Sequence, residues 1–332
     1  LFLGGNTGSK ETVIQFIDVT TTGNASDFGD LTAGRASLMS ASSKIRAVAA
    51  GGNTGSAVNV IDYVTIASEG NASDFGDLSS TSQEGTGTGS STRGLFQLGL
   101  ATDNVNTIEY VTIASTGNAT DFGDRTTTAA YGQDSAISSP TRGVFSGGFI
   151  SNSVNIIDYV TIASTGDATD FGDTSVTRYG MGGASSATRG VFGGGNTSGD
   201  TMDYITIAST GNASDFGNLT NSPRYISGTS NGVRGIFGGG KVSSTRQDVI
   251  QYITIASTGN ATDFGNLLAA KKSNAGASSL IKGIFGGGFT SARVNVIEQI
   301  TIASTGNSTD FGDLSASVHE LNACSSGHGG LA

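Results

Sequence analysis

The stretch that recurs along this sequence reads Tyr110-Val-Thr-Ile-Ala-Ser-Thr-Gly-Asn-Ala-Thr-Asp-Phe-Gly-Asp124. The other copies differ at a few positions: Glu69 stands where Thr116 does, and Phe16 and Gln299 replace Tyr110. Successive copies are 45 to 49 residues apart, as measured between their phenylalanines, which are Phe28, Phe75, Phe122, Phe171, Phe216, Phe264 and Phe311. Seven copies at one period indicate a repeat architecture in which each copy is one structural unit.

The composition supports one continuous domain. The 332 residues include 52 Gly and only 2 Pro, and 36% of them are hydrophobic. The glycines stand at fixed places between apolar runs, which is not the pattern of a disordered linker. No linker or change of composition interrupts the period, so residues 1–332 are expected to form a single domain of seven repeats, with a core built from small residues and regular stacking.

The net charge and the single cysteine limit which partners and cross-links are expected. The net charge is -10, and 12 of the 27 acidic residues are the Asp residues of the repeated Asp-Phe-Gly-Asp. This acidity disfavours nucleic acid, and no apolar run is long enough to predict insertion into a membrane. Cys324 is the single cysteine and therefore forms no intrachain disulfide. The chain starts at Leu1 with no initiator Met, so we expect it to be processed, truncated or part of a longer protein.

Each repeat contains four strand-like pieces. In one copy these are Arg178–Ser186, Arg189–Gly195, Thr201–Ala208 and Ser214–Leu219, with β-branched and aromatic residues in the third and a Gly-Asn turn before the fourth. No stretch shows a helical period with caps. The sequence therefore predicts an all-β, seven-bladed β-propeller with four-stranded blades. A parallel β-helix is the alternative, but its turns usually come at shorter periods.

The arrangement of the strands can also be predicted. The innermost strands of a propeller converge on a narrow axis and need small side chains, as in 37–42, 85–90 and 274–278. The tail at 325–331 aligns with the end of a first strand, and Leu1 begins where a second strand begins. We therefore expect the ring to close with N- and C-terminal strands that share one blade, which removes exposed sheet edges.

The pattern resembles the kelch repeat. An Arg precedes a strand that ends in a Gly doublet, a Tyr-bearing strand follows, and a short aromatic strand completes the unit; the residues are Arg189, Gly194, Gly195, Tyr204 and Phe216. Phe stands where kelch repeats usually have Trp. A longer pattern reads Arg-Gly-Val-Phe-Gly-Gly-Gly at 189–195 and Tyr-Ile-Thr-Ile-Ala-Ser-Thr-Gly-Asn-Ala-Ser-Asp-Phe-Gly at 204–217, and it covers essentially the whole chain. This pattern resembles kelch-like virion proteins of marine bacteriophages. This resemblance implies a tail or structural protein and supplies no mechanism.

The repeated turn invites three functional interpretations, each with a structural competitor. Asp-Phe-Gly occurs in kinases, but the other kinase motifs are missing. Gly-Asn-Ala-Thr-Asp-Phe-Gly-Asp could gather oxygen ligands for Ca²⁺, and the Asn-x-Ser/Thr triplets match glycosylation sites. We favour a structural turn: Phe fills the space between blades, Gly adopts a positive φ, and Asp accepts backbone N–H bonds. No metal site is assigned, and Ca²⁺ binding by these turns stays open.

A series of cations precedes the second strands, at Arg46, Arg93, Arg142, Arg189, Arg234 and Lys282. They could form a ring that binds an anion, but we favour pairing with carboxylates or carbonyls between blades. Catalysis finds little support, because His319 and His328 are the only histidines and lack partners for a triad or a metal site. We therefore expect neither enzymatic activity nor a cofactor.

We interpret the chain as a non-enzymatic phage virion protein, a tail-fibre or receptor-binding module. Its expected partners are other virion proteins and a glycan or protein of the host surface, and its expected location is the virus particle. The alternative is a structural decoration or scaffold that contacts only other virion proteins. A third hypothesis, a secreted bacterial hydrolase or oxidase, has the least support.

Ligand recognition is predicted in the loops after the Gly doublets. Repeated residues must satisfy the same packing seven times, whereas the loops after Gly52, Gly148, Gly195, Gly240 and Gly288 vary in length, charge and aromatic content. These loops should lie at one end of every blade and form a continuous face. The candidate binding residues are Phe149 and Phe289 as stacking platforms, with Lys241, Arg246 and Arg293 as polar contacts.

Overall fold

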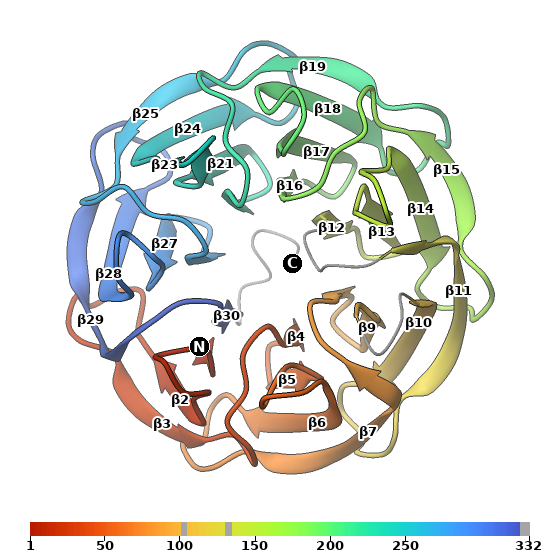
Figure 1. Cartoon of the computed structure of the whole chain (residues 1–332), viewed down its shortest axis with the longest axis vertical. Helices are drawn as coiled ribbons and strands as arrows, with labels where there is room; N and C mark the ends of the chain where they lie inside the picture. The colour runs from red at the N-terminus through yellow and green to blue at the C-terminus, as the bar shows by residue number, and fades with distance from the viewer. Residues whose placement is uncertain (101–104, 130–134, 326–332) are drawn as a thin grey trace.

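Seven four-stranded antiparallel sheets stand around a central axis (Figure 1). The computed structural model describes residues 1–100, 105–129 and 135–325, and these contain strands and turns but no helix. The fold is an all-β, seven-bladed propeller, which confirms the sequence-based prediction.

The strands of each blade are given from the axis outwards. Blade 1 consists of β30 (Asn322–Ala323), β1 (Phe2–Leu3), β2 (Val13–Phe16) and β3 (Ser26–Asp30); blade 2 of β4 (Met39–Ser42), β5 (Arg46–Ala50), β6 (Val58–Thr65) and β7 (Ser73–Ser82); blade 3 of β8 (Thr86–Gly89), β9 (Arg93–Gln97), β10 (Val105–Thr112) and β11 (Thr120–Ala129); blade 4 of β12 (Ser135–Ser138), β13 (Arg142–Ser146), β14 (Ile156–Thr161) and β15 (Thr169–Asp173).

The remaining blades follow the same order. Blade 5 consists of β16 (Met181–Ser185), β17 (Arg189–Gly194), β18 (Thr201–Thr206) and β19 (Ser214–Asn218); blade 6 of β20 (Ser227–Ser230), β21 (Arg234–Gly238), β24 (Val249–Thr254) and β25 (Thr262–Asn266); blade 7 of β26 (Ala275–Ser278), β27 (Lys282–Gly286), β28 (Val294–Thr301) and β29 (Thr309–Val318). A small hairpin, β22 (Lys241–Val242) with β23 (Thr245–Arg246), projects between β21 and β24.

The two ends of the chain close the ring within blade 1. β30 pairs with β1 through Phe2 and Ala323, and the amino group of Leu1 donates to the carbonyl of Cys324 at 3.0 Å. The closure prediction is thereby confirmed for β30; residues 326–331 of the predicted closing segment lie outside the described residues.

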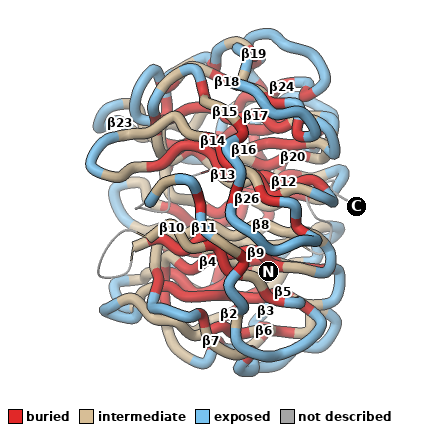
Figure 2. The backbone as a smooth tube through the Cα atoms, turned by 90° about the vertical axis from the view of Figure 1, so that its right-hand side faces the viewer, coloured by how far each residue is buried: buried red, intermediate tan, exposed pale blue. Residues whose placement is uncertain are grey.

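The strands nearest the axis carry small residues because their backbones approach one another closely. A Cβ added to Gly228 in β20 would lie 2.4 Å from the carbonyl oxygen of Gly183 in β16. Figure 2 shows the buried segments inside the ring and the exposed segments along its periphery. The small-residue segments at 37–42, 85–90 and 274–278 do contain the innermost strands β4, β8 and β26, as predicted.

Two details differ from the strand prediction. The first piece of blade 5 was expected to start at Arg178, but β16 starts at Met181. Arg178 is instead fully buried in the preceding loop, where its Nη2 lies 2.6 Å from Asp203. The outermost strand was expected to be short, yet β7, β11 and β29 have 10 residues each because they pair again beyond an irregularity in their register.

The repeated phenylalanines are buried between blades, as predicted. All seven are at most 3% exposed. Phe122 meets Tyr110 of its own blade edge to face, with ring centroids 5.7 Å apart. Phe75 of blade 2 belongs to the same core cluster as Phe96 and Val111 of blade 3. Each phenylalanine therefore joins the third strand of its own blade to the next blade.

The rest of the repeated stretch forms a hydrogen-bonded connection between neighbouring blades, which we call the outer clasp. Gly117 of blade 3 donates its N–H to the carbonyl of Phe75 in blade 2 at 2.7 Å. The side-chain oxygen of Asn118 accepts from the N–H of Asp77 at 3.1 Å, and Asp74 accepts from the N–H of Gly76 at 3.0 Å. These bonds recur in every blade and give the Asn and Asp side chains of the turn a structural role.

The outer clasp also seals the ring between its last and first blades. Gly23 of blade 1 donates to the carbonyl of Phe311 in blade 7 at 2.7 Å, and Asn24 accepts from the N–H of Asp313 at 3.0 Å. The seven clasps therefore form a closed circuit around the rim.

The cations before the second strands have the structural role that the sequence favours. Arg93 places its guanidinium carbon 4.6 Å from the ring centroid of Tyr110 and donates to the carbonyl of Ile162 in the next blade at 2.7 Å. Arg46, Arg142, Arg189 and Arg234 make the same two contacts. Lys282 differs, since it donates to Gln299 within its own blade at 2.7 Å.

A buried polar residue occupies one equivalent position on every third strand. Four of these residues are carboxylates in buried ion pairs: Arg35–Asp62, Arg125–Asp158, Arg178–Asp203 and Lys271–Glu298. Blades 1 and 6 have an amide there, Gln15 and Gln251. Blade 3 has Glu109, which accepts hydrogen bonds from the backbone and hydroxyl of Ser79. Burial is the largest influence on the pKa of Glu109 and raises it. The hydrogen bonds from Ser79 lower the pKa, and the charge of Asp121 raises it further, but both effects are smaller.

Replacing Glu109 by Gln is expected to stabilise the protein at neutral pH. The folded-state pKa of Glu109 lies above its unfolded value, so its contribution is present below the unfolded pKa and is lost as pH rises through the folded pKa. Urea unfolding of E109Q and wild type should therefore give a stability gain at pH 7 that shrinks toward acidic pH. The double variant E109Q/S80N, which copies the Gln251–Asn221 bond of blade 6, should gain at least as much.

The control for this experiment is D203N, which removes the carboxylate opposite Arg178. It should lower stability at pH 7, because it leaves a buried guanidinium without its counter-ion. A gain for E109Q that does not change with pH would contradict the assignment to Glu109 ionisation.

Truncation of Phe122 to Ala is expected to cost roughly 3–5 kcal/mol of unfolding free energy, because it leaves a cavity between two blades. Phe122→Leu, which retains most of the apolar volume, should cost clearly less. Urea titrations of both variants measure the difference; equal losses would show that the cavity does not determine the cost.

Candidate ligand-binding face

The variable loops gather at one end of the propeller, which we call the loop face. Loops after the Gly doublets connect second to third strands there, and the chain reaches the same end when it passes from an outer strand to the next innermost strand. Isolated β-bridges join the two sets of loops, for example between Arg224 and Lys241 and between Lys272 and Phe289. The turns of the outer clasp connect third to fourth strands and so lie at the opposite end.

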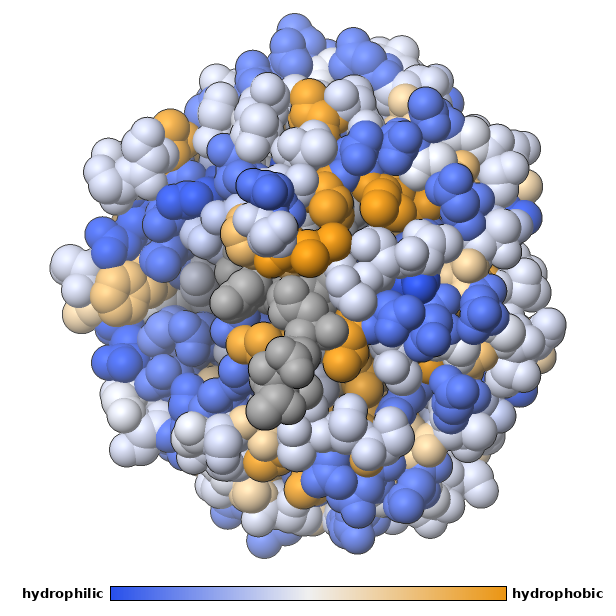
Figure 3. Space-filling model, turned by 45° about the vertical axis from the view of Figure 1, so that its right-hand side comes forward, coloured by the Kyte–Doolittle hydropathy of each residue, from blue (hydrophilic) through white to orange (hydrophobic). Residues whose placement is uncertain are grey.

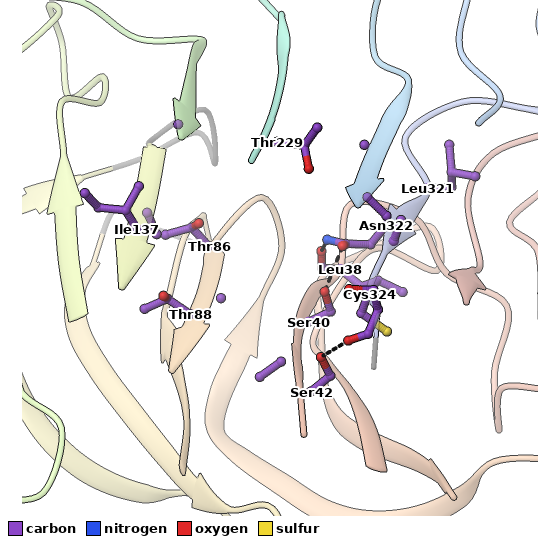
Figure 4. Close-up of a pocket in the computed structure, with 18 of the residues that line it drawn as sticks. Leu38, Ser40, Ser42, Thr86, Thr88, Ile137, Thr229, Leu321, Asn322 and Cys324 are labelled. Atoms are coloured by element: carbon purple, nitrogen blue, oxygen red, sulfur yellow. Dashed lines mark hydrogen bonds between the residues drawn. The ribbon is translucent and has the colours of Figure 1, made fainter. Parts of the chain in front are cut away.

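A channel of about 770 Å³ runs along the axis and is lined mainly by small residues of the innermost strands. Figure 4 shows Ser40 and Asn322 on adjacent blades joined by a hydrogen bond of 2.7 Å, and Ser42 donating to the carbonyl of Ser325 at 3.2 Å. Thr86, Thr88 and Thr229 also line it (Figure 4). In the space-filling view, hydrophobic residues gather around the middle, while hydrophilic residues are spread over the rest of this side (Figure 3).

Half-buried aromatic rings follow one another across the loop face. Phe149 meets Tyr179 with ring centroids 5.3 Å apart and planes at 72°, and Tyr179 lies 6.4 Å from Tyr225. Further along, Phe289 lies 5.4 Å from the ring of His319. The rings thus come from the loops of four successive blades and the connection into blade 1.

Basic side chains lie over the rings of this series. Lys272 is shared by two of them, 5.4 Å from the centroid of Tyr225 and 6.0 Å from that of Phe289. Lys241 and Arg224 lie 5.2 and 5.3 Å from Tyr225. Arg246 lies 4.9 Å from Phe289. Cation–π contacts of this kind hold both partners in place. We call the set the aromatic–cation arc; its members are Phe149, Tyr179, Tyr225, Phe289, Arg224, Lys241, Arg246, Lys272 and Arg293.

No described acidic side chain pairs with the cations of the arc. Within residues 1–100, 105–129 and 135–325, no ion pair involves Arg224, Lys241, Arg246, Lys272 or Arg293. Burial lowers the pKa of Lys241, and repulsion from Arg224, Lys272 and Arg246 lowers it further. Positive charge is therefore concentrated on this part of an acidic protein.

The two outer arginines of the arc are incompletely bonded. Arg293 donates from Nη2 to Asn6 at 3.2 Å. The Nε atoms of Arg246 and Arg293 are buried and have no hydrogen-bond partner among the described residues. These two N–H groups are therefore unsatisfied among the described residues, and their burial keeps them from an external ligand.

His319 closes the arc at blade 1. Burial lowers its pKa, and Arg293, Lys272 and Lys10 add to the effect, while Glu320 at 3.4 Å opposes it. His328, the other histidine for which the sequence predicts no triad or metal partner, lies outside the described residues.

The mouth of the channel is built from residues in an uncommon backbone conformation. Tyr225 (φ 58°), Glu84 (φ 56°) and Glu320 (φ 56°) each lie two positions before the first residue of an innermost strand. Tyr225 donates its N–H to the carbonyl of Gly180 at 2.9 Å, which fixes one blade against the next. A positive φ is costly for a bulky residue and is often found at functional sites.

The acidic part of the mouth faces blades 1 to 3. Burial raises the pKa of Glu84, the charge of Glu320 raises it further, and Lys10 lowers it. Because the basic residues of the arc belong to the loops of blades 5 to 7, the loop face is divided into a basic and an acidic sector.

Four of the five predicted binding residues lie together in the structure. Lys241, Arg246, Phe289 and Arg293 belong to neighbouring loops, whereas Phe149 lies at the far end of the arc, connected through Tyr179. The sequence analysis did not predict the residues on the connections into innermost strands, which are the arc members Tyr179, Arg224, Tyr225 and Lys272, together with His319 next to the arc. Their signal is an aromatic or charged residue placed just before a strand of small residues.

The described residues offer few groups for metal binding or nucleophilic catalysis. Among the described residues, no cluster of three or more His, Cys, Asp or Glu side chains could hold a metal ion. No described segment is a helix long and apolar enough to cross a membrane. Burial raises the pKa of the Cys324 thiol, which disfavours its nucleophilic form. In comparisons with known proteins, no family model and no curated protein sequence matches this chain.

Proposed function

We propose that this chain is a non-enzymatic adhesion module, a tail-fibre or receptor-binding component of a virus particle. The observation that carries the proposal is the aromatic–cation arc. It gathers aromatic rings and cations that have no acidic partner among the described residues. These residues stand on loops that vary between blades, on a scaffold that is otherwise repeated. Variable loops on a rigid scaffold are a common arrangement for recognition.

The repeated residues support a binding function without catalysis. The Tyr, Phe, Asn and Asp side chains of the seven copies are used for contacts within and between blades. A residue that must pack in the same way seven times cannot easily be adapted to one substrate. Recognition is therefore assigned to the loops.

The sequence pattern supports the assignment to a virus particle. The resemblance to kelch-like phage virion proteins rests on the longer repeated pattern, Arg-Gly-Val-Phe-Gly-Gly-Gly at 189–195 followed by Tyr-Ile-Thr-Ile-Ala-Ser-Thr-Gly-Asn-Ala-Ser-Asp-Phe-Gly at 204–217. Under this proposal the chain has two kinds of partner, other virion proteins and a molecule of the host surface.

One observation favours the alternative, a decoration that contacts only other virion proteins. Large apolar side chains are exposed at the end opposite the loop face, in the hairpins between innermost and second strands: Ile45 66%, Val233 64%, Leu280 64% and Ile281 66%. Exposed apolar side chains that gather on one face are typical of protein contacts.

Replacing the hairpin 241–246 by a Gly/Ser segment of equal length tests the proposal. The purified variant should bind host cells at least tenfold more weakly, because it loses Lys241 and Arg246 from the arc. Thermal melting should stay close to that of wild type, since the hairpin pairs only with itself and with neighbouring loops. The matched control exchanges 54–56, a loop on the same face without aromatic or basic residues.

Undiminished cell binding by the hairpin variant would contradict adhesion through the arc and leave the decoration hypothesis ahead. That hypothesis in turn predicts that L280S/I281S abolishes incorporation into particles and leaves cell binding intact.

A further inference from the structure

We propose that the aromatic–cation arc binds an acidic oligosaccharide, with carboxylate-bearing sugars lying across the rings of Tyr225 and Phe289. This inference rests on the proposed adhesion function and names its ligand class. It requires that the site accept negative charge, apolar ring faces and hydroxyl groups together.

The cluster of positive charges in the arc favours an anionic ligand. Lys272 and Lys241 both lie within 5.4 Å of the Tyr225 centroid, and Arg224 lies at 5.3 Å. Like charges this close repel one another, as the lowered pKa of Lys241 reflects. No acidic side chain among the described residues compensates them within ion-pair distance. An anionic ligand would remove this repulsion and form charge-assisted hydrogen bonds.

The arginines add directional donors. Arg246 stands over Phe289, and Arg293 donates from Nη2 to Asn6 at 3.2 Å. Because the Nε atoms of both arginines are buried, a ligand would bind their terminal Nη groups. A guanidinium can bind a carboxylate through two parallel hydrogen bonds, which a lysine cannot do. The pair therefore suits a planar carboxylate better than a diffuse negative charge.

The rings select a sugar as the carrier of that charge. Tyr179 and Tyr225 are tilted by 57° to one another and Phe149 by 72° to Tyr179, so successive rings do not present parallel faces. Stacked nucleic-acid bases need successive flat platforms. A chain of pyranose rings, whose apolar C–H faces turn along the polymer, fits tilted aromatics.

The total charge also disfavours nucleic acid. With a net charge of -10, the protein repels a strand that carries one phosphate per nucleotide, and only a few cations are available to offset it. An acidic oligosaccharide in which only some sugars carry a carboxylate has fewer negative charges for its length, and its neutral hydroxyls can accept hydrogen bonds from the cations of the arc. The rest of the surface therefore repels such an oligosaccharide less strongly.

Titration calorimetry with defined probes tests the proposal. Hexagalacturonate should bind the full chain, and its fully methyl-esterified form should bind at least tenfold more weakly, because the two differ in charge and hardly in shape. Raising the salt from 50 to 300 mM should weaken hexagalacturonate binding. A hexamer of thymidylate serves as the nucleic-acid probe.

Variants locate the binding in the arc. K272Q/R246Q should weaken hexagalacturonate binding at least tenfold, whereas K44Q, which removes an exposed cation at the opposite end, should leave it unchanged. Y225N removes the ring at a position where Asn tolerates the positive φ, and it should weaken binding while melting stays the same.

Each outcome decides the question. Equal binding of the acid and its methyl ester would overturn the requirement for charge, and tighter binding of thymidylate would replace a glycan with a nucleic acid. Absence of hexagalacturonate binding by a folded chain that still binds host cells through the 241–246 hairpin would overturn the ligand class alone. If the variant with a Gly/Ser segment at 241–246 binds host cells as well as wild type does, the adhesion function itself would be overturned.

Discussion

The structure depends on the contact between the Asp-Phe-Gly segment of one blade and the Gly-Asn turn of the next. At each of the seven junctions the turn Gly donates to the Phe carbonyl at 2.6–2.7 Å, and the side-chain oxygen of the next residue accepts from the backbone. The two backbones approach so closely that a Cβ on Gly123 would lie 2.4 Å from Gly166. This constraint explains why the stretch varies so little: it must fit its neighbour as well as its own blade.

The same constraint makes the two ends of the propeller different: the end with the clasps is repeated from blade to blade, and the loop face is variable. Clasps, phenylalanines and the Arg–Tyr pairs fix the blades, so their residues are occupied by the fold. The loops of the loop face, by contrast, differ from blade to blade in length, charge and aromatic content. The Asp residues of the clasp lie at the opposite end, and no described acidic side chain forms an ion pair with the cations around Tyr225 and Phe289. An acidic protein can in this way carry a local basic surface.

Most of the fold could be predicted from the sequence because the same pattern of strands and contact residues occurs in seven copies. Burial of Phe122, ring closure through β30 and the role of Arg93 follow from period, residue size and alignment. Contacts between non-equivalent residues could not be predicted. The contact of Lys272 with Phe289 depends on how a connection from one blade lies over a loop of another, and no periodic signal in the sequence indicates it.

The most direct test of the account compares two glycines of the same repeat. Gly123 (φ 139°) faces the backbone of the neighbouring turn, whereas a Cβ added to Gly117 (φ 151°) would meet no atom within 4 Å beyond its own chain neighbours. Alanine at either position suffers similar backbone strain, but only Gly123→Ala also collides with the next blade. Urea unfolding should show a much larger loss of stability for Gly123→Ala than for Gly117→Ala. Equal losses would contradict the claim that contact between blades at the clasp constrains the fold.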